Sequence, residues 1–90
     1  MEKQKYLFTP IQSDGKRLRS TEFESYSHSC EGIARSEMYW YSDGTLFRVE
    51  NSDTNAVEWF RKVDSGDPVS MSALEKVNEQ DVLNLLYGNN

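Results

Sequence analysis

The fold is decided by the stretch MYWYSDGTLFRVE, residues 38–50, which we interpret as a β-hairpin. An Asp-Gly pair in its middle suits a two-residue turn, because Gly accepts positive φ. That turn places Trp40 opposite Phe47. It also places Met38 opposite Val49, and alternation along the strands puts all four side chains on one face. A shift of one residue would mix apolar with polar side chains, so this apolar face should meet the core.

The opposite face of the predicted hairpin has the residue types of a protein interface. Helices usually cover one face of an antiparallel sheet in a small α+β domain, and Tyr and Arg are enriched among residues that dominate binding energy. We therefore predict that a partner binds this face together with nearby acids. The predicted partner-binding residues are Tyr39, Tyr41, Leu46, Arg48, Glu50 and Asp53. If a helix covered this face too, the tyrosines would be ordinary packing residues.

Upstream, the pattern predicts another hairpin. Lys5–Gln12 has the apolar side chains of a strand, and Pro10 lacks a donor N–H, so the strand should lie at the sheet edge or end there. A Ser-Asp-Gly turn follows, and the chain should return either through residues 16–19 or as far as Phe23. Between residues 20 and 36 strand, short helix and loop all fit the pattern, and we expect a further strand near residues 21–28.

Downstream, the pattern predicts a helix over residues 56–63. Four apolar residues follow the i, i+3, i+4, i+7 spacing of one helical face: Ala56, Trp59, Phe60 and Val63. The polar segment 51–55 would supply the side-chain oxygen that caps the first turn.

The last segment, residues 69–87, fits either one helix or a broken segment. A capping box begins at Ser72, but a single helix would put Asn78 and Asp81 inside its apolar stripe. We favour a break at Asn78, which then caps a final helix over residues 79–87. Its inward side chains would be Val82, Leu85 and Leu86.

A chain of 90 residues allows one small domain. We predict a single α+β domain over residues 1–90. Its antiparallel sheet of three or four strands comes from the N-terminal half, and two C-terminal helices pack on one face of that sheet.

Charge is unevenly distributed along the chain. Residues 1–36 hold six basic and five acidic residues, for a net +1, whereas residues 37–90 hold four basic and ten acidic residues, for a net −6. The total of −5 disfavours duplex nucleic acid as a direct partner, because binding to its backbone needs clustered Lys and Arg. The acidic half is either a solvated surface or a face for a basic partner. The sequence does not indicate whether it imitates nucleic acid.

The predicted cellular location rests on three features: the length of the apolar runs, the N-terminal segment and the number of cysteines. No apolar run approaches the ~18 residues of a membrane span, and the apolar run after the N-terminus is too short for a signal peptide. The single cysteine cannot form an internal disulfide, so we expect a reducing cytoplasm and no membrane partner.

Catalytic and metal-binding patterns are weak. His28 and Cys30 would share one face of a strand and could form a thiolate–imidazole pair, but no third group orients the histidine. Two such ligands also fall short of a zinc site. The segment 51–55 resembles the opening of a calcium loop, yet Ala56 and Lys62 replace the required Gly and Glu. We therefore expect no catalytic residue, no cofactor and no metal, and predict that the protein is not an enzyme.

These observations favour a small acidic cytoplasmic protein-binding module. We expect an inhibitor or adaptor that occupies a basic surface of a larger protein or nucleoprotein; chains of this composition occur among phage and mobile-element proteins. The first alternative is a single-stranded nucleic-acid binder that uses Tyr39 and Tyr41 as stacking platforms and the basic run 16–19. The second is a small enzyme or enzyme subunit that uses His28 and Cys30. The oligomeric state is not indicated.

Overall fold

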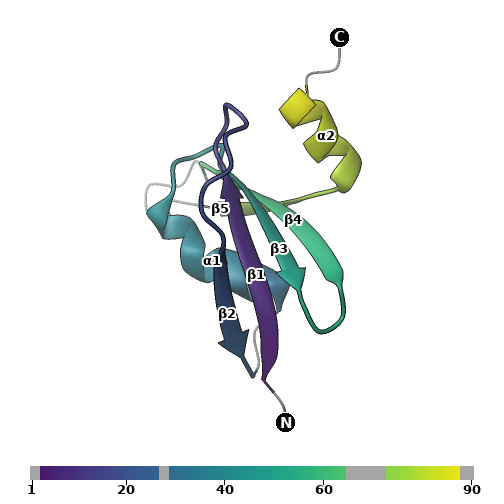
Figure 1. The fold of residues 1–90 in the computed structure, drawn as a ribbon. Helices are drawn as coiled ribbons and strands as arrows, with labels where there is room; N and C mark the ends of the chain where they lie inside the picture. The colour runs from purple at the N-terminus through teal and green to yellow at the C-terminus, as the bar shows by residue number, and fades with distance from the viewer. Residues whose placement is uncertain (1–2, 27–28, 65–72, 88–90) are drawn as a thin grey trace.

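Five strands form one antiparallel sheet in the order β2-β1-β3-β4-β5, with a helix packed on each face (Figure 1). The computed structural model describes residues 3–26, 29–64 and 73–87. In chain order the elements are β1 (Gln4–Ile11), β2 (Thr21–Ser25), α1 (Cys30–Glu37), the short 3-10 helix η1 (Met38–Trp40), β3 (Leu46–Asn51), β4 (Ala56–Val63), β5 (Ala73–Val77) and α2 (Glu79–Tyr87). The α+β class and the antiparallel sheet are confirmed, whereas the sheet has five strands and only one helix is C-terminal.

β2 pairs with β1 and confirms the strand expected near residues 21–28. The return strand predicted to begin at residue 16 is wrong in its first part, because residues 16–19 contribute only the isolated bridge between Arg17 and Ile11. Of the two alternatives predicted for Pro10, the edge strand is wrong, because β1 lies between β2 and β3, whereas the strand end is confirmed to within one residue, because β1 ends at Ile11. The N–H of Leu18 donates to the Pro10 carbonyl at 2.9 Å, so the Pro10 nitrogen faces the same side. The ladder to β2 has already ended there, at the pair Phe8 and Thr21. The missing donor therefore breaks no ladder hydrogen bond.

The chain before β3 is helical, so the hairpin predicted over residues 38–50 is wrong in its first strand. Ser29 caps α1, because its Oγ accepts the N–H of Gly32 at 3.1 Å. The buried residues of α1 and η1 follow helical spacing: Cys30, Ile33, Ala34 and Met38. Gly44 does turn the chain with φ of 89°, but it joins η1 to β3. Phe47 is buried as predicted.

The helix predicted over residues 56–63 is also wrong, because these residues form β4 between β3 and β5. The segment expected to cap that helix closes a hairpin instead. Asn51 Oδ1 accepts the N–H groups of Asp53 and Thr54 at 3.0 and 3.2 Å. Asn55 then adopts the left-handed conformation, with φ of 64°.

The helical spacing within β4 has a simple origin. Trp59 lies opposite Arg48 and Val77 on one sheet face, whereas Phe60 lies opposite Phe47 on the other. Because each face of the sheet is packed against a helix, apolar side chains occur on both faces of one strand. Two adjacent apolar residues then imitate one face of a helix.

Hydrophobic clusters lie on both sides of the sheet. On the α1 side, Phe8, Phe47 and Phe60 are buried against the helix, and the rings of Phe8 and Phe47 stack with centroids 5.3 Å apart. On the other side, a second cluster is formed by Ile11, Leu46 and Val77 of the sheet together with Val82 of α2. The two helices therefore do not share one face, contrary to prediction.

The break at Asn78 and the final helix are confirmed. Asn78 Oδ1 accepts the N–H of Asp81 at 2.8 Å, which caps α2. Val82 is buried and Leu86 packs against the second cluster, but Leu85 is half exposed rather than inward. Upstream of the break, the described residues form the strand β5, and the capping box at Ser72 lies outside the described residues. Neither described helix has the length and apolar character to cross a membrane.

Candidate protein-interaction surface

The structure separates the six predicted partner-binding residues, so the single binding face predicted for them is wrong. Leu46 is buried beneath α2. Arg48 and Glu50 lie on the sheet face away from α1, where Arg48 Nη1 and Glu50 Oε1 pair at 3.0 Å. Asp53 lies in the β3–β4 turn and accepts the N–H of Lys5 at 2.9 Å.

The two predicted tyrosines lie at the end of η1 and have different environments. Tyr39 is 69% exposed. Tyr41 is only partly exposed, because its ring packs against Phe8 and Phe47 with centroids 6.0 and 5.6 Å away. Burial, and secondarily the charge of Glu37, raises the pKa of Tyr41 above its ordinary value. Tyr39 is thus available to a partner, whereas Tyr41 anchors the chain that carries it.

Trp40 departs furthest from the prediction made from the sequence. It was predicted in the core, yet it is 80% exposed. A 3-10 helix has three residues per turn, so when Met38 points into the core the next two side chains point elsewhere. Tyr39 and Trp40, called the aromatic pair below, are therefore two exposed aromatic residues in succession, between the buried Met38 and the packed Tyr41.

A groove of about 420 Å³ lies beside Trp40. The loop from β1 toward β2 forms one wall, and η1 with the turn before β3 forms the other. The lining residues are Gln12, Ser13, Asp14, Leu18, Trp40, Tyr41, Ser42, Asp43 and Thr45. Two are aspartates and none of these described residues is basic, so the groove is both aromatic and acidic.

Backbone hydrogen bonds hold the wall formed by the turn. Gly44 donates to the Lys62 carbonyl at 2.7 Å, and Lys62 donates back to the Thr45 carbonyl at 3.0 Å. The Thr45 hydroxyl donates to the Ser42 carbonyl at 2.7 Å. The turn therefore extends the pairing with β4, and backbone hydrogen bonds fix this wall of the groove.

The opposite wall is a closed loop. Gln12 donates to the Lys16 carbonyl at 2.8 Å, and Gly15 donates to the Gln12 carbonyl at 2.8 Å. The two walls approach each other closely at Gly44 of the turn and Ser13 of the loop. If Gly44 carried a side chain, its Cβ would lie 3.6 Å from the Cβ of Ser13. Both walls are thus short, hydrogen-bonded turns.

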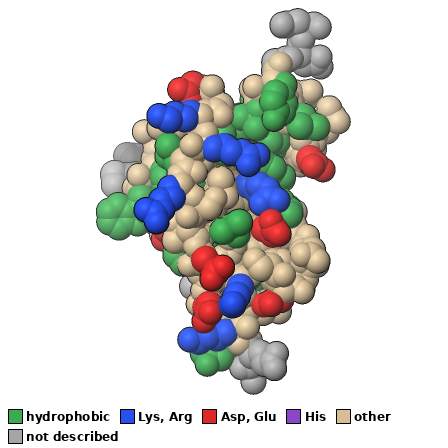
Figure 2. Space-filling model, viewed as in Figure 1, with side chains coloured by type: hydrophobic (Ala, Val, Ile, Leu, Met, Phe, Trp, Pro, Cys, Tyr) green, Lys and Arg blue, Asp and Glu red, His purple; other side chains and the backbone are tan. Residues whose placement is uncertain are grey.

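The sheet face without α1 is a second exposed surface. Figure 1 shows α1 behind the sheet, so this face is turned toward the reader. Across the strands, Arg48 lies beside Trp59, and Glu50 lies beside Leu7, which in turn lies beside Glu22. Figure 2 shows most Lys and Arg of this view in the upper half and most Asp and Glu in the lower half. This face is electrically mixed rather than uniformly acidic.

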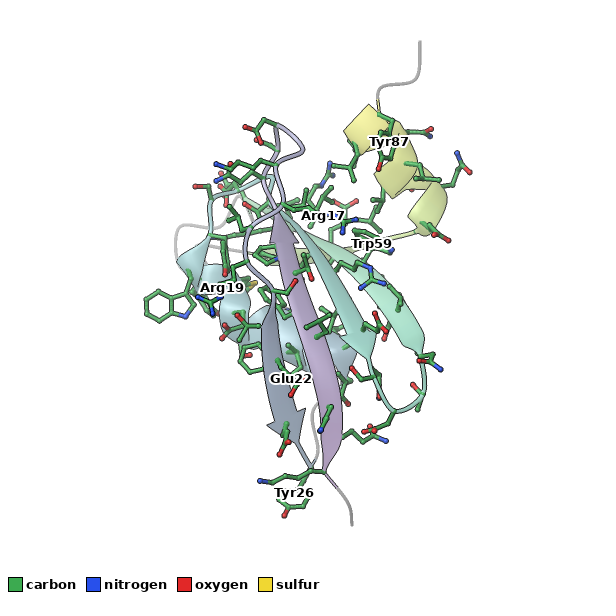
Figure 3. The ribbon with its side chains drawn as sticks, in the orientation of Figure 1. Arg17, Arg19, Glu22, Tyr26, Trp59 and Tyr87 are labelled. Carbon is green, nitrogen blue, oxygen red and sulfur yellow. The ribbon has the colours of Figure 1, made fainter. Side chains whose placement is uncertain are left out.

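The basic run of residues 16–19 borders the upper half of this face. Arg17 lies opposite Ile11 across an isolated bridge and is on the same side as Trp59 (Figure 3). Lys16, Arg17 and Arg19 are exposed and form no ion pair with a described residue. Tyr39 and Tyr41, the stacking platforms of the nucleic-acid alternative, are not on this face.

The cysteine that the enzyme alternative requires is buried in the first turn of α1. Burial, and then a hydrogen bond to Glu58 and the charge of that residue, raises the pKa of the Cys30 thiol to about 11. His28 lies outside the described residues. A thiol held in its neutral form is a poor nucleophile.

No group of three or more potential metal ligands occurs among residues 3–26, 29–64 and 73–87. Comparisons of the chain with protein-family models, with curated proteins and with solved structures found no match.

The aromatic pair was missed because residues 38–41 alternate as a strand would. The helical spacing from Cys30 through Ile33 and Ala34 to Met38 was the signal that could have found it. Continuing that spacing places Trp40 away from the core.

Proposed function

We propose that this protein is a protein-binding module, an inhibitor or adaptor that docks on a basic surface of a larger protein. The observation that supports the proposal is the exposed Trp40, which lines the acidic groove and follows the exposed Tyr39 in the chain. Trp and Tyr are the side chains most often found to dominate interface energies. A tryptophan that is four-fifths exposed gains most of its possible burial only when a partner covers it.

The rigidity of the surface favours binding. η1 is anchored by Met38 and Tyr41, and both walls of the groove are hydrogen-bonded turns. Binding then needs little ordering of the chain, so less of the gross interaction energy is lost to conformational entropy.

The negative charge of the groove and of residues 37–90 supports the proposal that the partner surface is basic. The groove carries Asp14 and Asp43, and residues 37–90 have a net charge of −6. Such a charge accelerates encounter with a positively charged surface and loses its effect as salt rises. The single buried cysteine suits a reducing compartment, and we place the protein in the cytoplasm. The proposal assigns it no catalytic activity.

One observation favours a second candidate, a single-stranded nucleic-acid binder. Lys16, Arg17 and Arg19 form no ion pair with a described residue, and Arg17 shares a sheet face with Trp59. Cations beside an aromatic ring suit a single strand. We rank this candidate second because Trp59 is partly buried and the lower half of the same face is acidic.

The test is affinity isolation from the native cell extract with three tagged baits. The wild-type protein and Tyr26→Ala should retain the same partner protein, whereas Trp40→Ala should lose it. Tyr26 is a matched control, because it is 58% exposed and lies at the opposite end of the sheet from Arg17 (Figure 3). Retention of the partner by Trp40→Ala would contradict the proposed surface. Recovery of single-stranded nucleic acid alone would favour the second candidate.

A further inference from the structure

We propose that the groove beside Trp40 receives an arginine side chain of the protein partner, an inference that rests on the proposed function. The lining combines two carboxylates, two aromatic rings and several hydroxyl and carbonyl oxygens, with no basic side chain among its described residues. A guanidinium is a planar cation with five donors that stacks on aromatic rings and pairs with carboxylates. It is the protein side chain whose chemistry matches all parts of this lining.

The two carboxylates retain capacity for a cation. Asp14 forms no ion pair with a described residue, and its Oδ1 accepts only the backbone N–H of Lys16, at 3.0 Å. The cation paired with Asp43 is Lys62, whose Nζ is 4.0 Å from Oδ1. That ammonium is mostly buried and donates at 2.5 Å to the Tyr41 carbonyl. Asp43 is therefore only partly neutralised, and more than half of its side chain is exposed.

The aromatic side chains supply the stacking surface. Trp40 is exposed enough to accept a planar group on its ring, and Tyr41 is held by Phe8 and Phe47 beside it. Cations over an aromatic ring are more often arginine than lysine, and Trp is the best partner. The aromatic rings thus distinguish arginine from a simple point charge such as an ammonium.

The dimensions suit one side chain rather than a folded element. The groove volume of about 420 Å³ lies in the lower part of the range of roughly 300–1,000 Å³ for small-ligand sites. The docking partner would place its own surface on Tyr39 and Trp40 and insert one arginine between the two turns.

The experiment is an NMR titration of the isotope-labelled full chain with the peptide acetyl-Gly-Arg-Gly-amide. The matched control peptide carries citrulline, which keeps the shape of arginine and removes its charge. We expect shifts of the Trp40 indole N–H and of the Ser42, Asp43 and Thr45 amides in the millimolar range, with the Trp59 indole unchanged. The citrulline peptide should bind at least tenfold more weakly, and a lysine peptide should also bind more weakly.

Variants locate the site within the chain. Asp14→Asn combined with Asp43→Asn keeps the hydrogen-bond acceptors and removes both charges, so it should abolish the shifts. Glu22→Gln combined with Glu24→Gln removes the same charge from β2, outside the groove, and should leave them intact. Equal binding of the arginine and citrulline peptides, no shift with either peptide, or shifts that survive in the double aspartate variant would each overturn the inference.

The same variants separate this inference from the proposed function. If Trp40→Ala loses the partner and the double aspartate variant binds it as tightly as wild type, the protein-binding role stands and the arginine site is refuted. If the peptide binds in the groove but no partner is lost with Trp40→Ala, the proposed function fails instead.

Discussion

Replacement of Trp40 by Ala should leave the domain almost as stable as wild type. Trp40 is 80% exposed, so folding removes only one-fifth of its surface from water. A large aromatic side chain buries up to roughly 250 Å², and one-fifth of that, at about 25 cal/mol per Å², is about 1 kcal/mol. That value is an upper bound, because real unfolded chains already bury part of this surface.

Phe47→Ala is the matched comparison. Phe47 is 0% exposed and stacks on Phe8, so its truncation should cost about 3–5 kcal/mol. That loss is a large part of the roughly 5–13 kcal/mol available to a 90-residue domain.

The assay is a urea titration followed by far-UV circular dichroism, which does not depend on the fluorescence of the replaced tryptophan. With a slope of about 1 kcal/mol per molar, Trp40→Ala should lower the midpoint by less than about 1 M and Phe47→Ala by about 3 M or more. Equal losses for the two variants would refute the helical placement of Trp40 and restore the hairpin register.

Four further predictions concern one turn, the cap of α2 and the buried thiol. Asn55→Val should lower stability by about 1–2 kcal/mol in thermal unfolding, because Asn55 has φ of 64°, whereas Asn55→Gly should not; equal effects would contradict the turn. Asn78→Ala should cost about 1 kcal/mol in a urea titration through loss of the cap on α2, and a neutral result would contradict the capping bond. Cys30 should resist alkylation in the native state, because burial raises its thiol pKa to about 11. Because folding favours the neutral thiol, the stabilisation by Cys30 is complete below pH 9.0 and is lost as the pH rises toward 11. In urea titrations across this pH range, the free energy of unfolding of Cys30→Ala should therefore fall less than that of wild type. The same pH profile for both proteins would contradict the raised thiol pKa.

The elements that could be predicted from the sequence are those with local chemical signals. The first strand follows from its apolar residues, the Ser-Asp-Gly turn from Gly15, which has φ of 90°, and α2 from the cap at Asn78. In each case the decisive group lies within a few residues of the element it starts or ends. Such signals do not depend on what packs against the chain.

The elements that could not be predicted depend on long-range packing. The segment 56–63 satisfies a helical period only because β4 has apolar residues on both of its faces, and the contacts with α1 and α2 are remote in sequence. Val57 and Val63, with the two aromatic residues between them, are types enriched in strands, and that propensity was the available signal.

The candidate surface was predicted only in part. Tyr39 is exposed as expected, but Leu46 is buried because α2 covers the face that the sequence pattern left open. Arg48 and Glu50 lie on the predicted side of β3, at a distance from the aromatic pair that no local pattern could reveal. Trp40 was assigned to the core because the predicted hairpin register placed it opposite Phe47 on an apolar face, and its exposure is the structural finding that carries the proposal.

Calorimetric titration of the purified partner with wild-type protein, Trp40→Ala and Tyr26→Ala tests the central claim most directly. The claim predicts that Trp40→Ala loses about 2 kcal/mol of binding free energy or more, which is roughly 30-fold in Kd. Tyr26→Ala should bind within twofold of wild type. Wild-type affinity for Trp40→Ala, with its fold intact by circular dichroism, would contradict the claim that this protein acts by binding another protein through Tyr39, Trp40 and the groove beside them.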